Sequence, residues 1–125
     1  MQIPCVEEKI RHDPETRQAV ATLWDRRLDN IPDMKDYPCT VALQFETHGQ
    51  FLSMNTFMRS NDAWLGLPYD MFQFTQLQMS LANALGLEYC RYRHTTLSMH
   101  LYEENWDVAS RIHHPSEERW QPCGI

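Results

Sequence analysis

The sequence predicts an α+β domain in which a twisted, mainly antiparallel sheet is backed by one long helix. Residues 39–47 alternate apolar and polar side chains, which is the pattern of a half-buried strand. Residues 48–50 contain a glycine and predict a turn, and residues 51–58 predict the returning strand of a hairpin. Residues 69–85 carry Phe and Leu at three- and four-residue steps, which is the spacing of a helix with one buried face.

The segments before the hairpin are shorter and more polar. Residues 1–12 are mixed and charged and predict a helix or an extended arm. Residues 13–17 predict a turn, because their proline fixes its own φ and lacks an N–H donor. Residues 19–24 predict a short strand, and residues 25–37 predict a polar loop.

The segments after the long helix complete one domain. Gly86 is the expected C-terminal stop of that helix. Residues 88–102 are rich in Tyr, Thr and Leu and predict one or two strands, whereas residues 103–125 predict loops with room for one short element. We therefore expect a single domain over residues 1–125, a length that one hydrophobic core can serve.

Composition limits the classes of function. Of the 125 residues, 42% are hydrophobic and 22% are charged, as in globular proteins. The net charge of -6 argues against a nucleic-acid-binding scaffold, which is usually basic. We expect no membrane span, because no apolar run reaches about 18 residues. Residues 1–8 lack the pattern of a signal peptide, so we expect a cytoplasmic protein.

The cysteine and histidine positions do not predict a metal site. The four cysteines stand at positions 5, 39, 90 and 123 and form no C-x-x-C pair. They therefore predict neither a disulfide framework nor a zinc site. We expect His113-His114 to be a surface pair, and we predict no bound metal.

The segment from Arg59 to Asp70 carries several reactive or anion-binding groups. It lies between a predicted strand and a predicted helix, and N–H groups at a helix N-terminus favour anions. The hairpin also brings Cys39 close to Arg59, and a cation beside a thiol favours the thiolate. Taken singly, Cys39 suits a small buried hydrophobe and Asp70 a carboxylate that complements the helix dipole. Equally ordinary structural or surface roles suit Asp62, His100 and Tyr102.

The order and spacing of these groups resemble the thymidylate synthase family. That family carries a Pro-Cys nucleophile, an Arg-Ser-x-Asp block continued by Leu-Gly-Leu-Pro, and a His-x-Tyr pair. The matching residues are Pro38-Cys39, Gln44-Phe45, Arg59-Ser60-x-Asp62, Leu65-Gly66-Leu67-Pro68 and His100-Leu101-Tyr102. A further match to the family's phosphate segment at the dimer interface is Asp13-Pro14-x-x-Arg17 followed by Trp24. The resemblance covers about residues 10–105.

The resemblance implies a role for each matched residue. Cys39 would add as a thiolate to C6 of a pyrimidine ring, which makes C5 a nucleophile toward a folate-borne methylene group. Catalytic roles would fall on Cys39, Arg59 and Asp70. The phosphate of the nucleotide would contact Arg59 and Ser60, and also Arg17 of the neighbouring subunit. The sugar 3′-hydroxyl would contact His100 and Tyr102, and the base would contact Asp70. Gln44 would be a conformational support in the site. The co-substrate would be 5,10-methylenetetrahydrofolate, served by Asp62 and Gly66.

Asp70 stands where thymidylate synthases have Asn. An Asn amide matches uracil, whose N3–H donates and whose O4 accepts, whereas cytosine reverses both groups. A carboxyl group can match cytosine, either as the neutral acid or as a carboxylate with N3-protonated cytosine. In the family, Asp at this position marks the deoxycytidylate hydroxymethylase branch, and Thr96-Leu97-Ser98 also departs from the synthases. We therefore expect hydroxymethylation of deoxycytidylate, with thymidylate synthesis from deoxyuridylate as the alternative.

The resemblance also bears on partners. We expect a pyrimidine deoxynucleoside monophosphate as ligand and a homodimer as assembly, because the family counterpart of Arg17 serves the opposite subunit. Gln18 and Thr40 depart from a second arginine and a histidine of the family. The family's N-terminal phosphate loop and catalytic glutamate, and its C-terminal segment that closes over folate, have no counterpart in this sequence. The resemblance therefore leaves three alternatives: a fragment, a chain whose partner supplies the missing half, or a protein that no longer catalyses. The last of these is the second hypothesis, a non-catalytic nucleotide-binding or assembly subunit.

Overall fold

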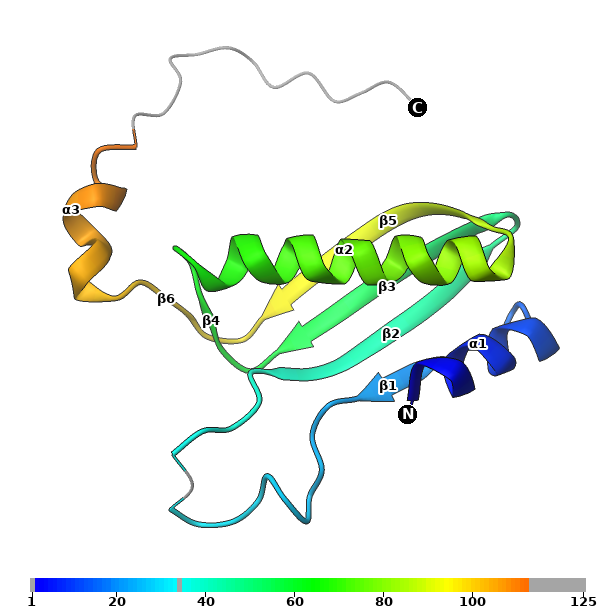
Figure 1. Ribbon diagram of the computed structural model, residues 1–125, viewed down its shortest axis with the longest axis horizontal. Helices are drawn as coiled ribbons and strands as arrows, with labels where there is room; N and C mark the ends of the chain where they lie inside the picture. The colour runs from blue at the N-terminus through cyan, green and yellow to red at the C-terminus, as the bar shows by residue number, and fades with distance from the viewer. Residues whose placement is uncertain (1, 34, 113–125) are drawn as a thin grey trace.

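A computed structural model describes residues 2–33 and 35–112, so His113-His114 and the cysteine at position 123 lie outside the described residues. The elements follow in chain order in Figure 1. They are α1 (Gln2–His12), β1 (Val20–Thr22), β2 (Thr40–His48), β3 (Phe51–Met58), β4 (Asn61–Asp62), α2 (Gly66–Leu85), β5 (Glu88–Thr96), β6 (Met99–His100), a 3-10 turn (Glu103–Asn105) and α3 (Trp106–Ala109).

Four strands form one sheet in the order β1-β2-β3-β5. The pairs β1–β2 and β2–β3 are antiparallel, and β5 joins the edge of β3 in parallel. The chain passes from β3 to β5 through α2, which lies across one face of the sheet (Figure 1). The prediction of a mainly antiparallel sheet backed by one long helix is confirmed. The short strands β4 and β6 pair in parallel beside it as a separate two-stranded sheet.

The β2–β3 hairpin sets the position of the residues at its open end. Its register runs from Thr40 opposite Met58 to His48 opposite Phe51, so the turn is one residue shorter than the sequence predicts. Gly49 adopts a positive φ of 60° in this turn, a conformation that glycine adopts without steric cost. At the other end the residues that precede β2 and follow β3 lie side by side.

The core lies between the sheet and the helices α1 and α2. Leu43 and Phe45 of β2 and Leu52 and Met54 of β3 are buried on the face that the helices cover. The apolar stripe predicted for α2 packs against them, and α1 adds two buried side chains to the same cluster. These helix residues are Leu81 and Ala82, with Phe74, Leu77 and Leu85 partly buried, and Val6 and Ile10 of α1.

The helix α2 begins three residues earlier than its apolar pattern predicts, at Gly66 rather than at Tyr69. Pro68 falls in the first turn, where a missing N–H costs little because no intrahelical acceptor is available there. The other end agrees with the prediction. Gly86 adopts the left-handed conformation and its N–H donates to the carbonyl of Asn83, which ends the helix.

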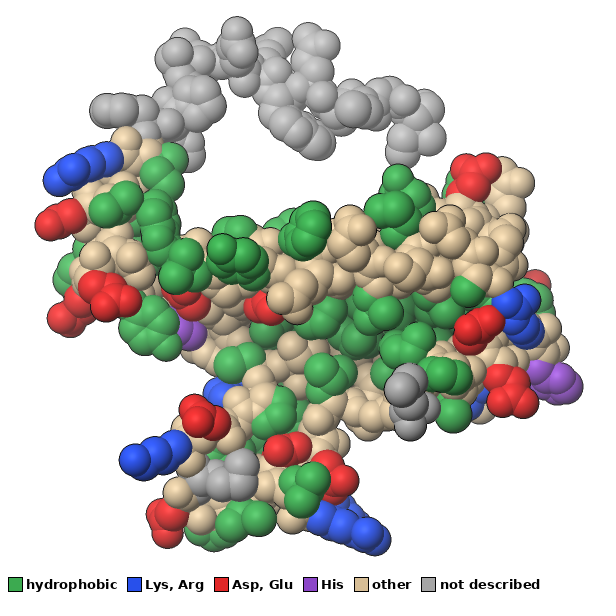
Figure 2. Space-filling view, in the orientation of Figure 1, with side chains coloured by type: hydrophobic (Ala, Val, Ile, Leu, Met, Phe, Trp, Pro, Cys, Tyr) green, Lys and Arg blue, Asp and Glu red, His purple; other side chains and the backbone are tan. Residues whose placement is uncertain are grey.

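The outer side of α2 is apolar near the start of the helix. Figure 2 shows hydrophobic side chains gathered along this helix and toward α3. The exposed apolar residues include Leu65, Tyr69, Met71 and Phe72 near the start of α2, and Trp106 of α3. Helices in the described part of the chain are all too short or too polar to cross a membrane.

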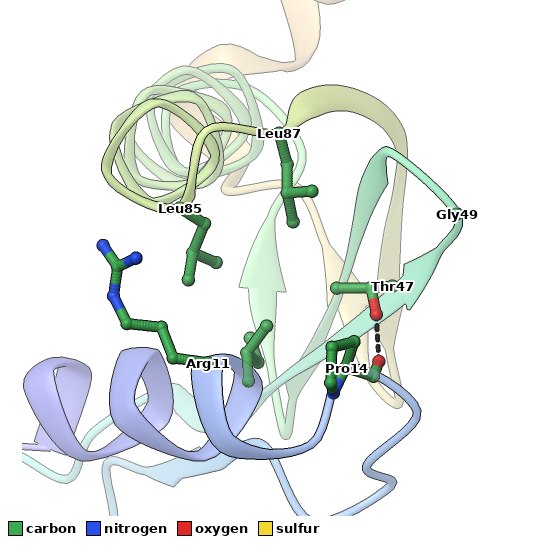
Figure 3. A pocket seen from close by; sticks show the side chains of 7 residues that line it. Arg11, Pro14, Thr47, Gly49, Leu85 and Leu87 are labelled. Atoms are coloured by element: carbon green, nitrogen blue, oxygen red, sulfur yellow. Dashed lines mark hydrogen bonds between the residues drawn. The ribbon is translucent and has the colours of Figure 1, made fainter.

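A pocket of about 350 Å³ opens where α1, the hairpin turn and the end of α2 meet (Figure 3). Ile10, Leu85 and Leu87 give it an apolar wall. Two contacts close its edges, because Arg11 donates to the carbonyl of Ala84 and the Thr47 hydroxyl donates to the carbonyl of Pro14. The pocket lies at the turn end of the hairpin, opposite the end that carries Cys39 and Arg59.

A buried amide of α2 repairs an irregularity in the sheet. Leu52 pairs with Tyr89 but Met54 pairs with Tyr92, so β5 has one extra residue at this point. Gln78 is 2% exposed, and its Nε2 donates to the carbonyl of Leu52 at 2.8 Å and to that of Arg91 at 3.1 Å. The amide thus joins both strands across the bulge.

We expect Gln78→Leu to lower the free energy of unfolding by about 1–3 kcal/mol, because the two carbonyl groups lose their donor while the volume is kept. Urea unfolding followed by circular dichroism measures the change. Gln76→Leu is the matched control, because Gln76 is exposed on the same helix, and its effect should stay within about 0.5 kcal/mol. Equal losses in the two variants would show that the bonds across the bulge do not matter.

Candidate functional site

Most of the predicted site residues gather at one end of the central strands of the sheet, β2 and β3. Cys39 immediately precedes β2 and Arg59 immediately follows β3, and the N–H of Arg59 donates to the carbonyl of Cys39 at 2.9 Å. The pairing of β4 with β6 then brings His100 opposite Asp62. The start of α2 follows directly, so the end of β3, the strands β4 and β6 and the N-terminus of α2 lie at the same end of the sheet (Figure 1).

The guanidinium of Arg59 holds the segment that leads to Cys39. Its Nε donates to the carbonyl of Pro38 at 3.0 Å and its Nη2 to that of Tyr37 at 2.9 Å. The indole of Trp24 also donates to Pro38, at 2.9 Å, and stacks on the ring of Tyr37. A guanidinium has five N–H groups, so three remain for an anion. Arg59 is exposed and lines a cavity of about 440 Å³.

Ser60, His100 and Tyr102 form a second group. The Oγ of Ser60 lies 3.3 Å from Nδ1 of His100. The rings of His100 and Tyr102 meet edge to face, with centroids 4.9 Å apart. Tyr102 is 56% exposed, so its hydroxyl is accessible to a ligand. The structure thus brings together three of the residues predicted to bind phosphate and sugar.

Asp62 caps the N-terminus of α2. Its carboxylate accepts from the N–H groups of Trp64, Leu65 and Gly66 at 3.1, 2.9 and 3.2 Å. The bonds from Leu65 and Trp64 are the main reason that the pKa of the Asp62 carboxyl lies below its usual value. The residue predicted to serve folate therefore has a defined structural task in this chain.

Gly66 allows a buried side chain to approach the helix. A Cβ at this position would lie 2.7 Å from Oδ1 of Asn61, closer than a real Cβ contact. Its backbone is helical, so the missing side chain rather than a special φ makes glycine necessary here. Packing against Asn61 therefore accounts for the glycine without any ligand.

Asp70 lies one turn into α2 and faces a polar cluster that the sequence analysis did not identify. Asn61 is 3% exposed, and its Nδ2 lies 2.9 Å from Nε2 of His94. Nδ1 of His94 lies 2.7 Å from the hydroxyl of Tyr92. Burial raises the pKa of the Asp70 carboxyl, and the imidazole of His94 and the amide of Asn61 oppose that rise.

The same cluster perturbs its other two titratable groups. Burial lowers the pKa of His94, and the carboxylate of Asp70 offsets part of that fall. Burial also raises the pKa of the Tyr92 hydroxyl. Titratable groups shifted by burial and by a specific partner are typical of functional sites, although ordinary ion-pair networks shift them as well.

Two predicted site residues lie elsewhere. Gln44 is in the middle of β2, between the buried Leu43 and Phe45, so its side chain points to the opposite face of the sheet. Arg17 is exposed and lines a cavity with Thr47 and His48 at the turn end of the hairpin. The structure does not bring either residue to Cys39 within one chain.

The gathered residues supply an exposed thiol, a guanidinium with free N–H groups, hydroxyl and imidazole groups, and a carboxyl with a raised pKa. This combination suits nucleophilic addition to a phosphate-bearing substrate. No group of three or more possible metal ligands occurs among residues 2–33 and 35–112.

Comparisons with known proteins agree with this arrangement. A family model described as thymidylate synthase matches residues 1–119. Over 107 residues the chain is 37% identical to a deoxyuridylate hydroxymethyltransferase of Bacillus phage SP01. That match covers 84% of this chain and 28% of the phage protein, so the chain spans little more than a quarter of this relative's length.

Proposed function

This chain belongs to the thymidylate synthase family, and we propose that it acts in the transfer of a one-carbon unit to C5 of a pyrimidine nucleotide. The observation that carries the proposal is that Cys39, Arg59 and the Ser60–His100–Tyr102 group gather at one end of the sheet's central strands. The residue types match what the reaction requires: a nucleophile, an anion-binding group and polar contacts for a sugar.

The chemistry starts at Cys39. Its thiolate forms a bond from Sγ to C6, and the electron pair of the C5–C6 double bond moves toward C5. C5 then attacks the one-carbon unit, for which 5,10-methylenetetrahydrofolate would be the source. Loss of the C5 proton would expel the folate nitrogen from the transferred carbon. Addition of water or of a hydride to that carbon would then release the thiolate from C6 and restore the C5–C6 double bond. Completion by water gives a hydroxymethyl product, and completion by a hydride gives a methyl product.

The residues proposed to serve folate are compatible with that group. The Asp62 carboxylate has about four acceptor positions and accepts three N–H groups within the chain. One position is therefore open to an N–H of a ligand at the surface. Gly66, by contrast, is accounted for by Asn61, so its proposed contact with folate has no separate support.

Arg17 supports the proposal of a homodimer. The strands β2 and β3 have 9 and 8 residues, and at about 3.3 Å per residue they separate the turn end from Cys39 by about 25 Å. Arg17 lies at the turn end. Only a second chain can bring an Arg17 guanidinium to the phosphate beside Arg59, which is the arrangement the family resemblance implies.

Asp70 favours deoxycytidylate as the nucleotide. A carboxyl group that carries the proton donates to N3 of cytosine and accepts from its amino group, and burial raises the pKa of Asp70 in the direction this pairing needs. The name of the phage relative favours deoxyuridylate instead. Both nucleotides are therefore candidates, and the hydrogen bonds between Asp70 and the base decide between them.

We expect the chain to exchange the C5 hydrogen of deoxycytidylate with solvent. Addition of Cys39 to C6 makes C5 basic enough to take up a deuteron, and reversal releases the labelled nucleotide. Proton NMR in D2O measures the loss of the C5–H signal. Cys39→Ser should reduce exchange to the background rate while binding remains, and Cys90→Ser, at another exposed cysteine, should leave it unchanged. Binding without exchange in the wild type would favour a non-catalytic subunit.

We expect Asp70→Asn to shift the ratio of deoxycytidylate to deoxyuridylate affinity toward deoxyuridylate by about one to two orders of magnitude. The phosphate and sugar contacts are common to both nucleotides, so the substitution changes only the free energy of the contacts with the base. Calorimetric titration of the wild type and the variant measures the ratio, with Glu88→Gln, at an exposed carboxylate at the start of β5, as the control. Equal affinity of the wild type for both nucleotides, with no change on substitution, would mean that Asp70 does not select the base.

We expect Arg17→Ala to weaken nucleotide binding although Arg17 is remote from the site of its own chain. Tyr102→Ala, at an exposed site position, should weaken it as well. An equal mixture of the two variants should regain full affinity in roughly a quarter of the sites, because half of the dimers then hold one intact site. Strictly monomeric behaviour in sedimentation, with and without nucleotide, would refute the shared site.

A further inference from the structure

Asn61 connects Asp70 to a histidine that no part of the reaction described above uses. The Nδ2 of Asn61 lies 2.9 Å from Nε2 of His94 and 3.2 Å from Sδ of Met58, and the same side chain is close enough to Asp70 to oppose the rise in the pKa of that carboxyl. Tyr92 holds the other nitrogen of His94 at 2.7 Å. The imidazole is thus fixed from both sides, with the base-selecting carboxyl one amide away.

The hydrogen-bond partners of its two ring nitrogens determine the tautomer of His94. An amide nitrogen donates and never accepts, so Nε2 of His94 has to accept from Asn61. The proton of the neutral ring is then on Nδ1, from which it donates to the Tyr92 hydroxyl. Burial lowers the pKa of His94, which agrees with a neutral ring at neutral pH.

Protonation of His94 would disturb Asn61. The new proton would be on Nε2 and would face the N–H groups of the Asn61 amide at 2.9 Å, donor against donor. The amide would have to rotate to present its oxygen to His94, and this rotation would change the group that Asn61 presents to Asp70. The state of His94 is thereby coupled to the hydrogen bonding of Asp70.

We propose that His94 is a positioning residue which, through the Asn61 amide, fixes the hydrogen-bonding state of Asp70 and makes the choice of pyrimidine depend on pH. This inference rests on the proposed function, in which Asp70 faces the base. It assigns to His94 a control of specificity, whereas Asp70 makes the contact.

Proton balance gives the direction of the effect. Pairing of cytosine with Asp70 requires one proton between the carboxyl and N3, whichever atom holds it. Uracil brings its own N3–H and requires no proton from solvent. A positive charge on His94 opposes the proton that cytosine needs, so a protonated His94 weakens deoxycytidylate binding.

The groups that face His94 leave Asp70 as its main charged partner. Among the described residues, α2 contributes Asp70, its own strand β5 contributes Tyr92, and β4 contributes the neutral Asn61. The paired position on β3 is Thr56, which carries no charge. Asp70 and His94 therefore titrate as a coupled pair.

The sign of the pH dependence follows. The pKa of Asp70 is raised from 3.8 and that of His94 is lowered from 6.5. As pH falls from neutral, uptake of the cytosine-pairing proton becomes easier and deoxycytidylate affinity rises. Once His94 takes up its own proton, the affinity falls again. We expect a maximum at a pH below 6.5 for deoxycytidylate, with no such rise for deoxyuridylate.

The test compares the full chain with His94→Gln by calorimetric titration with both nucleotides from pH 4.5 to pH 8, a range of about two pH units on either side of an imidazole's usual pKa. Glutamine keeps an acceptor for Asn61 but cannot take up a proton. Its deoxycytidylate affinity should keep rising where that of the wild type falls, and the two should diverge by about tenfold per pH unit below the His94 pKa. His12→Gln, at an exposed histidine at the end of α1, is the matched control and should follow the wild type.

The outcomes separate this inference from the proposed function. Absence of binding of either nucleotide to the wild type would overturn the proposed function, and the inference with it. Binding with a pH profile that His94→Gln leaves unchanged would overturn only the inference. A uniform loss of affinity for both nucleotides at every pH would also overturn it, because that result indicates a purely structural histidine.

A second measurement needs no nucleotide. Imidazole nitrogen chemical shifts should show the Nδ1–H tautomer of His94 at neutral pH in the free protein. Asp70→Asn should lower the pKa of His94 further, because Asp70 stabilises the imidazolium. An unchanged His94 titration in Asp70→Asn, or an Nε2–H tautomer, would refute the coupling.

Discussion

The N–H of Arg59 donates to the carbonyl of Cys39 at 2.9 Å and closes the open end of the β2–β3 hairpin. This bond exists only in one register, because a one-residue slip would turn Leu43 and Phe45 out of the core. The burial of those side chains therefore fixes the thiol beside the guanidinium. Ser60, β4 and the start of α2 follow Arg59 directly in the chain, so their positions depend on the same register.

Two buried amides keep the fold consistent where its regular pairing fails. Gln78 donates to both strands where β5 has an extra residue. Asn61 fills the space that Gly66 leaves open and contacts His94. A buried amide without partners would cost about 1–3 kcal/mol. Each of these amides therefore stabilises one arrangement of its neighbours against the alternatives, and the two together hold α2 against the sheet.

The sequence predicted the elements well because their periodicity is simple. The alternation in residues 39–47, the apolar steps in residues 69–85 and the stop at Gly86 each follow from local rules. The cluster of Asn61, Tyr92 and His94 was missed for a different reason. Asn61 is the variable position of the Arg-Ser-x-Asp motif, and periodicity does not show which groups meet across α2. One signal was available in β5, where Arg91 and Arg93 alternate with Tyr92 and His94. This alternation indicates that Tyr92 and His94 point inward.

The positions of Arg17 and Gln44 could not follow from the sequence, because motif order carries no distances. Asp62 shows the converse case, in which a motif residue has a task within the chain, since its carboxylate caps α2. A ligand-binding role adds to such a task without replacing it.

Arg59 combines both kinds of task in one side chain. Two of its N–H groups hold the carbonyls of Tyr37 and Pro38, which fixes the approach to Cys39, and three are left for an anion. A lysine has three donors on one rotating nitrogen and no fixed fork, so it could not hold two carbonyls and a phosphate with defined geometry. Because the guanidinium is already ordered by the carbonyls, phosphate binding would order little further side-chain freedom. The same two bonds that shape the thiol's surroundings would therefore also prepare the guanidinium for the proposed phosphate contact.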